Sequence, residues 1–449
     1  MWERIKMTEK HYSVFTAQRG ANPNWDLVRS IEQEAERNGS EIIILPSNGR
    51  FPSSTKADQE EVLHPYFADN YRVVENDLAL NSNIDIRHFP VKAQQMDPTT
   101  SWDRFVAYDR SAIMPSPKQR MRVVPTSNTK LPQVLMSTGA ITHPNYKDNS
   151  WGTKAMLDHV YGGIKVIVKD DKIFHYRQLR ATKNGVFYDL AVRYDGKNQP
   201  RQERLEAMVL GDIHCAQLNP EAWAATEDMI RNYRPKHLML HDLFDGYSIN
   251  HHDMKNIVRR TQKFGMSLEE ELHQVGEFLQ ATHELEPSMK IHIVKSNHDE
   301  VIDRYLTEGR FVEDPQNIDL ALELFKELRN DGDPLKKGVE MTYGRVPKVH
   351  YMRIDEDFKI RGNQLGAHGH MGLNGARGSI RSFEKAYGKG VCGHYHVPEI
   401  FRKCMSVGLL ANMDMYYNRG GASSWVHCNA LIPKTGEPQL VNIIEGEYK

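Results

Sequence analysis

The chain has 449 residues, of which 39% are hydrophobic and 26% charged, as is ordinary for a globular protein with room for roughly two or three domains. Its formal net charge is −1, so the chain has no overall positive field to attract nucleic acid, and such binding requires a local basic patch. No run approaches the roughly 18 apolar residues of a membrane span, and the N-terminus lacks a signal-peptide pattern. The four cysteines have no metal-site spacing, so we expect reduced thiols, no membrane partner and a cytoplasmic location.

The first residues predict an alternation of strand and helix. An apolar run at 12–17 predicts a strand, and Asn24 or Asp26 is suited to cap the helix that follows it. Gly39 predicts the end of this helix, and the run EIIIL at 41–45 predicts a buried strand. This order is typical of an α/β unit.

The region that follows changes character twice. Residues 46–125 contain few periodic segments, whereas the stretch after them predicts a β-meander with strands at 133–142, 163–168, 172–179 and 185–194. The polar, turn-rich stretch DGKNQPRQ at 195–202 then predicts a domain boundary. We therefore expect an N-terminal α/β accessory domain at 1–200 and a second domain at 201–449.

The second domain predicts a layered α/β arrangement, because apolar strands that end in loops with Asp and His alternate with helical segments. We expect strands at 208–210, 237–240 and 291–294, and a helix through 268–279. The tail at 406–444 predicts strands and loops that close the sheet.

Five short polar segments carry the chemistry, and most of them follow a predicted strand. They are 211–214 (GDIH), 241–246 (HDLFDG), 296–299 (SNHD), 367–370 (AHGH) and 393–396 (GHYH). Groups at the carboxyl ends of sheet strands share one rim, so these segments are expected to converge. Carboxylate, amide and imidazole groups suit Mn²⁺, Fe or Zn²⁺. One such segment alone is more often surface or core decoration, but five in order predict a metal site.

A site with two cations about 3.5–4 Å apart would explain these residue types. One carboxylate would bridge the ions, which clamp the oxygens of a phosphate ester and convert a bridging water to hydroxide. An imidazole near the leaving oxygen would then act as the proton donor. The sequence therefore predicts an enzyme that hydrolyses phosphate esters.

The five segments resemble the signature of the calcineurin-like metallophosphoesterases, which runs D-x-H, G-D-x-x-D, G-N-H-D/E, H and G-H-x-H. The resemblance covers roughly residues 205–430. It implies a β-sandwich flanked by helices in the second domain, preceded here by the additional α/β domain. The chain is also distantly similar to SbcD-type DNA nucleases, although in those proteins the first motif lies at the start of the chain.

The resemblance also implies roles by position. One metal ion would be held by Asp212, His214 and His396, and the other by Asn297, His368 and His394. Asp242 would bridge both ions. His298 would be the acid or the group that stabilises the transition state, and Asp245 or Asp299 would orient it as further catalytic residues. The two divalent ions are expected to be Mn²⁺, with Fe or Zn²⁺ as alternatives.

The chain departs from the signature at two positions. His241 and Ser296 stand where the family has Gly, but neither position supplies a ligand, so the metal sites are not affected. His241 is bulky enough to reshape its loop or to contact substrate. The fourth motif is the least certain match: His368 is favoured as the ligand, and His370 is the alternative.

Several residues are candidates for substrate binding. Arg377 and Arg381 belong to a segment, 361–389, that is rich in basic residues and could form a wall for a polyanion, or the solvated face of a helix at 379–387. His251 and His252 follow the second motif and would line the cleft, unless they are ordinary surface residues. A second basic stretch contains Lys118, Arg120, Arg122 and Lys130 and is a weaker candidate for nucleic-acid contact.

Three functions remain open at this stage. The favoured one is a metal-dependent DNA nuclease or phosphodiesterase. The alternatives are a phosphomonoesterase or protein phosphatase, and a binding or scaffold protein with a vestigial metal site. The N-terminal domain would select substrate, mediate homo-oligomerisation or dock a partner.

Overall fold

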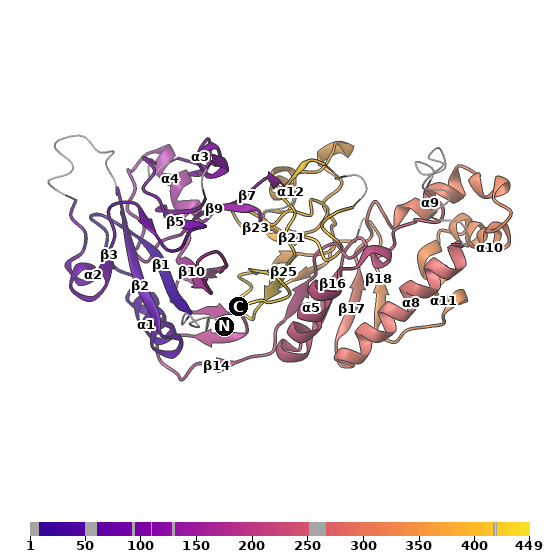
Figure 1. Ribbon diagram of the computed structural model, residues 1–449, viewed down its shortest axis with the longest axis horizontal. Helices are drawn as coiled ribbons and strands as arrows, with labels where there is room; N and C mark the ends of the chain where they lie inside the picture. The colour runs from indigo at the N-terminus through magenta and orange to yellow at the C-terminus, as the bar shows by residue number, and fades with distance from the viewer. Residues whose placement is uncertain are drawn as a thin grey trace, which may run out of the picture.

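The computed structural model describes residues 9–49, 61–91, 95–108, 110–127, 131–250, 266–354, 356–415, 418 and 420–449. The predictions for His251, His252 and Lys130 fall outside these ranges. Within them, no helix is long and apolar enough to cross a membrane. The molecule is elongated, with the N-terminal sheet at one end and helices α8 to α11 at the other (Figure 1). The fold is of the mixed α/β type, as expected, and has several sheets.

The start of the chain folds as its sequence predicts, through β1 (Lys10–Gln18), α1 (Trp25–Asn38) and β2 (Ser40–Ser47). The Asn24 side chain caps α1 by accepting the backbone N–H of Leu27. Gly39 ends the helix with a left-handed φ of 62°, which glycine adopts without steric cost. Both local signals are therefore confirmed.

The N-terminal sheet has five strands in the order β11-β10-β1-β2-β3. Its further strands are β3 (Arg72–Val73), β10 (Gly162–Val168) and β11 (Phe174–Arg180). The expected meander holds for the antiparallel pair β10 and β11. The last predicted strand instead turns back on itself, since it forms a separate three-stranded sheet of β12 (Phe187–Asp189), β13 (Val192–Tyr194) and β14 (Arg201–Gln202).

The second half of the chain contains a six-stranded sheet in the order β18-β17-β16-β15-β25-β26. The first four strands are parallel, and the predicted strands at 208–210, 237–240 and 291–294 lie among them. The bounds are β15 (Ala207–Val209), β16 (His237–Leu240), β17 (Lys290–Ile293), β18 (Val349–Tyr351), β25 (Cys428–Ile432) and β26 (Gln439–Asn442).

Helices pack on the outer face of this sheet (Figure 1). Those nearest the strands are α5 (Pro220–Tyr233) and α8 (Leu268–Leu285), the second of which confirms the predicted helix. A helical group then follows β17, made of α9 (Glu300–Thr307), the 3-10 turn η2 (Arg310–Glu313), α10 (Ile318–Arg329) and α11 (Pro334–Thr342). Short helices elsewhere are α2 (Pro65–Asn70), α3 (Asp103–Tyr108), α4 (Ser150–Leu157), α12 (Ile380–Tyr387) and the 3-10 turns η1 (Cys215–Gln217) and η3 (Leu373–Gly375).

A ten-stranded sheet joins the two halves of the chain. Its order is β19-β20-β21-β23-β22-β7-β9-β6-β5-β4, and the halves meet where Ile400 of β22 pairs with Met121 of β7. The bounds are β4 (Leu78–Ala79), β5 (Ile84–Ile86), β6 (Ser111–Met114), β7 (Met121–Val124), β9 (Gln133–Ser137), β19 (Lys359–Ile360), β20 (Asn363–Gln364), β21 (Gly390–Cys392), β22 (Glu399–Phe401) and β23 (Cys404–Ser406). A separate pair joins β8 (Thr126–Ser127) to β24 (Ala422–Ser423).

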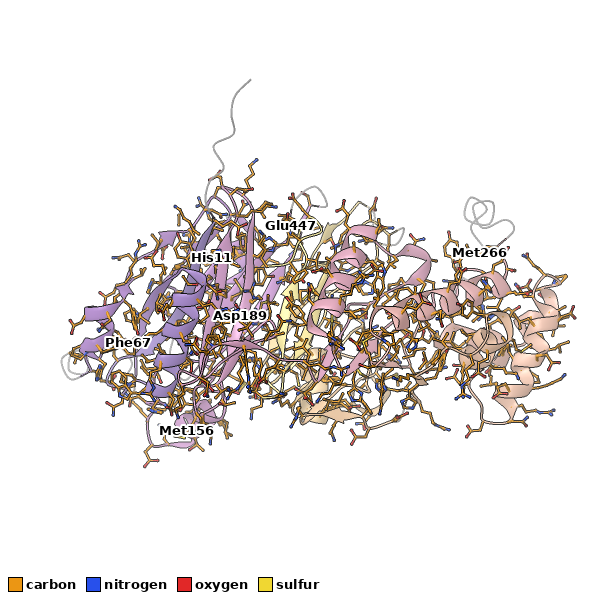
Figure 2. All side chains as sticks on the ribbon, turned by 90° about the horizontal axis from the view of Figure 1, so that it is seen from below. His11, Phe67, Met156, Asp189, Met266 and Glu447 are labelled. Atoms are coloured by element: carbon orange, nitrogen blue, oxygen red, sulfur yellow. The ribbon has the colours of Figure 1, made fainter. Side chains whose placement is uncertain are left out.

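One apolar core spans the predicted boundary near residue 200. It combines N-terminal side chains such as Val14 and Ile164 with C-terminal ones such as Val209 and Met405. The C-terminal tail also returns to the N-terminal half, where the carboxylate of Glu447 lies 2.8 Å from Nζ of Lys169 (Figure 2). The two predicted domains are thus joined by a shared sheet and a shared core.

Candidate metal centre

The loops after β15, β16 and β17 leave the same edge of the six-stranded sheet, and the loop after β21 meets them there. Four residues in these loops have left-handed backbone without being glycine: His214 (φ 49°), Asp242 (φ 44°), His394 (φ 78°) and His396 (φ 57°). Such backbone costs on the order of 1 kcal/mol per residue and is concentrated at functional sites. The chain therefore bends unfavourably at the positions where the sequence predicts ligands.

Three of the predicted ligands form the first group. Nε2 of His396 lies 3.3 Å from Oδ2 of Asp212 and 3.2 Å from Nε2 of His214. One ligand atom each from Asp212, Asp242 and His396 lie within 4.8 Å of one another. All of these side chains are buried. Their donor atoms therefore surround a common point, as a single cation would require.

The second group lies on the other side of the Asp242 carboxylate. Nε2 of His368 is 3.2 Å from Oδ1 of Asp242, whereas Nε2 of His214 is 3.7 Å from Oδ2 of the same carboxylate. The rings of His368 and His394 lie with their centroids 5.3 Å apart. Asp242 thus has one oxygen toward each group, which is the geometry expected of a bridging ligand.

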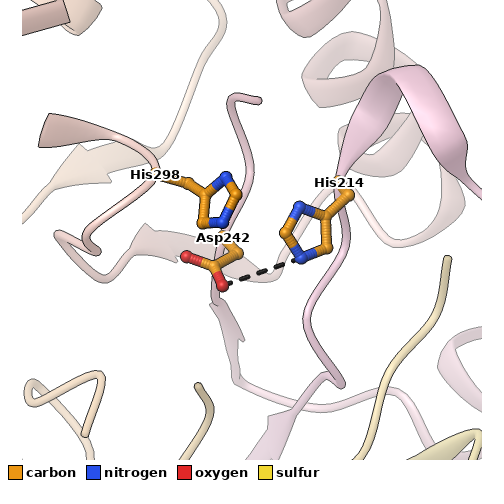
Figure 3. Close-up of side chains that lie close together, drawn as sticks. All are labelled: His214, Asp242 and His298. Atoms are coloured by element: carbon orange, nitrogen blue, oxygen red, sulfur yellow. Dashed lines mark ion pairs between the residues drawn. The ribbon is translucent and has the colours of Figure 1, made fainter. Parts of the chain in front are cut away.

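His298 lies beside His214 and the Asp242 carboxylate. Its ring centroid is 4.6 Å from that of His214, and it forms a second set of close donor atoms with His214 and Asp242 (Figure 3). Because it is close to the bridging carboxylate, its imidazole is well placed to contact a group bound there.

The fit of the site to metal ions can be judged from its buried donor atoms. Within the described residues, both carboxylate oxygens of Asp212, Oδ1 of Asp242, Oδ1 of Asn297 and Nε2 of His368 are buried without a hydrogen bond of good geometry, although ion-pair contacts of 3.2 and 3.3 Å join His368 to Asp242 and His396 to Asp212. A buried polar atom without a partner costs about 1–3 kcal/mol, so native proteins rarely leave several together. Divalent cations would satisfy all of these atoms, and their oxygen and imidazole chemistry matches the expected metals.

The charges of the centre point the same way. Burial and the neighbouring Asp242 raise the pKa of Asp212 to about 7. Burial opposes ionisation of Asp242 as well, but the imidazoles of His368 and His298 hold its pKa well below the usual range. Two carboxylates this close and this buried repel each other unless positive charge lies between them.

The hydrogen bonds of Asp245 and Asp299 correct one prediction. Both were expected as candidates to orient His298, but the Asp245 carboxylate lies 2.7 Å from Nδ1 of His214 and accepts the backbone N–H of Ala216. Burial lowers the pKa of His214, but the Asp245 carboxylate outweighs this effect and raises that pKa to about 9. Asp299 accepts the backbone N–H groups of Phe244 and Ser296, so it ties two ligand loops together.

The two departures from the family signature are both buried in the centre. Nδ1 of His241 lies 3.2 Å from Nδ1 of His368, so His241 contacts a predicted ligand. Ser296 donates its hydroxyl to Asp299 and accepts the Asp299 N–H, which a glycine could not do. Both residues therefore support the ligand loops.

His368 and His370 occupy different environments. His368 is fully buried against Asp242, whereas Nε2 of His370 lies 3.7 Å from Oε2 of Glu300 on α9. The ring of His370 is 5.4 Å from that of His368 and 6.0 Å from that of His394. The geometry thus favours His368 as the ligand and places His370 beside the centre.

Most of the predicted basic wall is already neutralised. Arg381 forms an ion pair with Asp97 at 3.3 Å and lies over the ring of Phe401, and similar pairs join Arg361 to Glu206 and Lys389 to Glu437. Arg377 is exposed and has no ion pair among the described residues. Lys385 of the same segment is likewise exposed and without an ion pair among the described residues, so Arg377 and Lys385 remain candidates for substrate contact.

The three described residues of the second basic stretch contact other parts of the fold. Lys118 and Arg120 are each 1% exposed, and Arg122 is paired with Asp97. Lys118 donates to the carbonyl of Gln95, and Arg120 lies near Asp158. The count of basic residues was therefore misleading here, because these side chains are used inside the fold.

Several residues that shape the centre could not be predicted from the sequence. Trp425 packs edge-on against His396 with ring centroids 4.6 Å apart, and Asn429 accepts the N–H of Gly211. Glu271 on α8 accepts the N–H groups of Tyr247 and Ser248. Arg304 on α9 donates to the carbonyl of Asn297. The sequence indicates this contact only by placing Arg304 shortly after the SNHD motif.

Comparison with known proteins gives one informative result. No protein-family model matches the sequence. The chain is similar to Protein A1 of Escherichia phage T5, with 26% identity over 465 residues that cover 98% of this chain and 83% of that protein. The name of that protein states no activity. The similarity spans both the N-terminal half and the candidate metal centre.

Proposed function

We propose that this chain is a calcineurin-like, metal-dependent phosphoesterase that hydrolyses phosphodiester bonds in DNA. The observation that carries the proposal is the convergence of all five motifs at one sheet edge, with buried donor atoms that lack hydrogen bonds of good geometry. The six-stranded sheet, the facing part of the ten-stranded sheet and the outer helices correspond to the sandwich that such enzymes would need.

The residues divide into two sets of ligands. Asp212, His214 and His396 would hold one divalent ion, Asn297, His368 and His394 the other, and Asp242 both. When bound, two such ions, which we expect to be Mn²⁺, supply a water-derived nucleophile at neutral pH and positive charge against the phosphate oxygens. The Asp245 carboxylate holds the His214 ring with its Nε2 toward the centre.

His298 is the proposed proton donor to the leaving oxygen. Its buried Nδ1 makes no hydrogen bond within the described residues. It lies beside the bridging carboxylate, where the scissile phosphate would be bound. An imidazole at this place can give a proton to the departing oxygen.

A polynucleotide is favoured because one exposed arginine lies on α9, beside carboxylates of the same helix, and another lies on the loop after His370. Arg304 and Arg377 are both exposed there. Phosphates next to the scissile one would be held by such side chains, and a small monoester has no such neighbours. The four cysteines are free thiols, which fits a reducing cytoplasm.

The test compares substrates and one variant. Protein loaded with Mn²⁺ is assayed on linear DNA, circular DNA, RNA and p-nitrophenyl phosphate in parallel. We expect DNA to be cleaved and His298→Ala to retain both metal ions while it slows cleavage by about 10²–10⁴-fold, the range for general acid–base groups. His273→Ala, on the exposed face of α8, is the matched control and should be silent.

Two outcomes would contradict the proposal. Rapid hydrolysis of p-nitrophenyl phosphate with intact DNA would indicate a phosphomonoesterase. An unchanged rate in His298→Ala would remove its role as the acid.

A further inference from the structure

A short hairpin, residues 371–377, projects directly from the metal centre. Met371 pairs with Arg377 in an antiparallel bridge, and the N–H of Gly372 donates to the carbonyl of Ala376 at 2.7 Å. At its base, the N–H of Gly378 donates to the carbonyl of His370. The hairpin is therefore ordered by its own hydrogen bonds and begins three residues after the ligand His368.

The base of the hairpin is tied to a second ligand loop. The hydroxyl of Tyr395, between His394 and His396, donates to the carbonyl of Gly369 at 2.8 Å. A Cβ on Gly378 would lie 1.8 Å from the same carbonyl oxygen, so only glycine fits there. The position of the hairpin is thus fixed relative to the metal ligands.

The hairpin carries two apolar side chains that are open to solvent, Met371 at its base and Leu373 at its turn. Met371 is 55% exposed and Leu373 is 44% exposed, and the side chain of Arg377, which pairs with Met371, is also exposed. No acidic residue occurs between 366 and 383. Single exposed apolar residues are common on protein surfaces, but here two of them lie on one short hairpin with an arginine, next to the candidate site.

The chain offers a contrasting surface on the other side of His370. A cavity of about 550 Å³ there includes Glu300, which contacts His370. Its lining has five carboxylates, Glu300, Asp303, Glu327, Asp331 and Asp333, against three basic residues, Lys295, Lys336 and Arg353. These carboxylates disfavour a bound polyanion in this cavity. A nucleic-acid strand that reaches the centre would therefore lie over the hairpin on the other side of His370.

We propose that the hairpin 371–377 binds unpaired nucleobases, and that the substrate of the centre is DNA that is single-stranded or frayed at the cleaved bond. This inference rests on the proposed function. Met371 and Leu373 would insert against base faces while Arg377 holds a phosphate. In an intact duplex these faces are stacked, and opening one step costs a few kcal/mol, a cost that a single strand does not have.

The experiment compares three diester substrates: a single-stranded oligonucleotide, the blunt duplex of the same sequence and bis-p-nitrophenyl phosphate. The hairpin variant is Met371→Ser with Leu373→Ser. The control variant is Val312→Ser with Leu322→Ser, which removes two apolar side chains of similar exposure, 66% and 42%, on η2 and α10. All proteins are loaded with Mn²⁺, and metal content is measured first.

For the wild type we expect kcat/KM on the single strand to exceed that on the duplex by at least about tenfold. In the hairpin variant, we expect kcat/KM on the oligonucleotide, divided by kcat/KM on bis-p-nitrophenyl phosphate, to fall by about tenfold. This is the size expected for the loss of one base contact, and it should arise from a higher KM on the oligonucleotide. The control should keep the wild-type ratio.

An unchanged ratio in the hairpin variant, or a wild type that prefers the duplex, would overturn the inference and leave the proposed function in place. A wild type that loads Mn²⁺ yet hydrolyses none of the three diesters would instead overturn the proposed function, and the inference with it.

Discussion

Asp245 holds the ring of His214, a proposed metal ligand, by a hydrogen bond. Its carboxylate is 2.7 Å from Nδ1 of His214, and its other oxygen accepts the N–H of Ala216. A carboxylate in this position sets the tautomer of the imidazole, so that Nε2 is free to bind a metal ion.

Asp245→Asn should therefore weaken Mn²⁺ binding by about 10–100-fold while the protein stays folded, as is usual when such a supporting partner is lost. Isothermal titration calorimetry on metal-free protein would measure this. Asp319→Asn, an exposed carboxylate on α10, is the matched control. Wild-type affinity in Asp245→Asn would show that His214 does not need this partner.

The same residues show what sequence can predict at this scale. Motif spacing named Asp212, Asp242 and His368, because strand ends impose a common rim whatever the loops do. Motif spacing assigned Asp245 as a partner of His298, whereas its carboxylate contacts His214. Hydrogen-bond partners depend on loop geometry, which the spacing of motifs does not describe. It also could not show that Arg120 is buried, because a charged residue in a sequence carries no information about its ion pairs.

At the scale of elements, the loop after β21 depends on one glycine. A Cβ on Gly393 would lie 2.3 Å from Oδ1 of Asp212 and 3.0 Å from Cβ of His241. Three motif loops approach one another here more closely than any other residue would permit.

Gly393→Ala should therefore separate the loops and abolish binding of at least one metal ion, although the sheet beneath them is retained. Metal analysis and far-ultraviolet circular dichroism would measure the two effects. Gly421→Ala, where an added Cβ meets nothing closer than 4.0 Å, is the control. Full metal content in Gly393→Ala would contradict the close packing described here.

Elements with strong local signals were predictable. Helix α1 has its cap at Asn24 and its stop at Gly39, and β16 matches its prediction residue for residue. The strands of the ten-stranded sheet were not predicted in most cases, because many are two to four residues long and gain their order from neighbours distant in the sequence. Such pairings have no local signature.

At the scale of the whole molecule, the two halves of the chain share one core. Met121 is fully buried within it, and it pairs across the junction with Ile400. The ends of the chain also meet, through an ion pair between Lys449 and Glu9. The turn-rich stretch at 195–202 indicated a boundary, but turn residues cannot report how much surface is buried between the parts that they join.

Because the core is shared, we expect calorimetry to show a single unfolding transition. Met121→Ala should lower the midpoint temperature of this whole transition. Truncation of a buried methionine costs roughly 2–5 kcal/mol. The exposed Met341→Ala is the control. Two transitions, of which Met121→Ala shifts only one, would show that the halves fold independently.

We propose above that two metal ions share Asp242. Crystals grown with Mn²⁺ and measured at the manganese absorption edge would test this directly. We expect two anomalous peaks about 3.5–4 Å apart on either side of the Asp242 carboxylate, and none in Asp242→Ala. A single peak, peaks away from Asp242, or two peaks that survive in Asp242→Ala would contradict it.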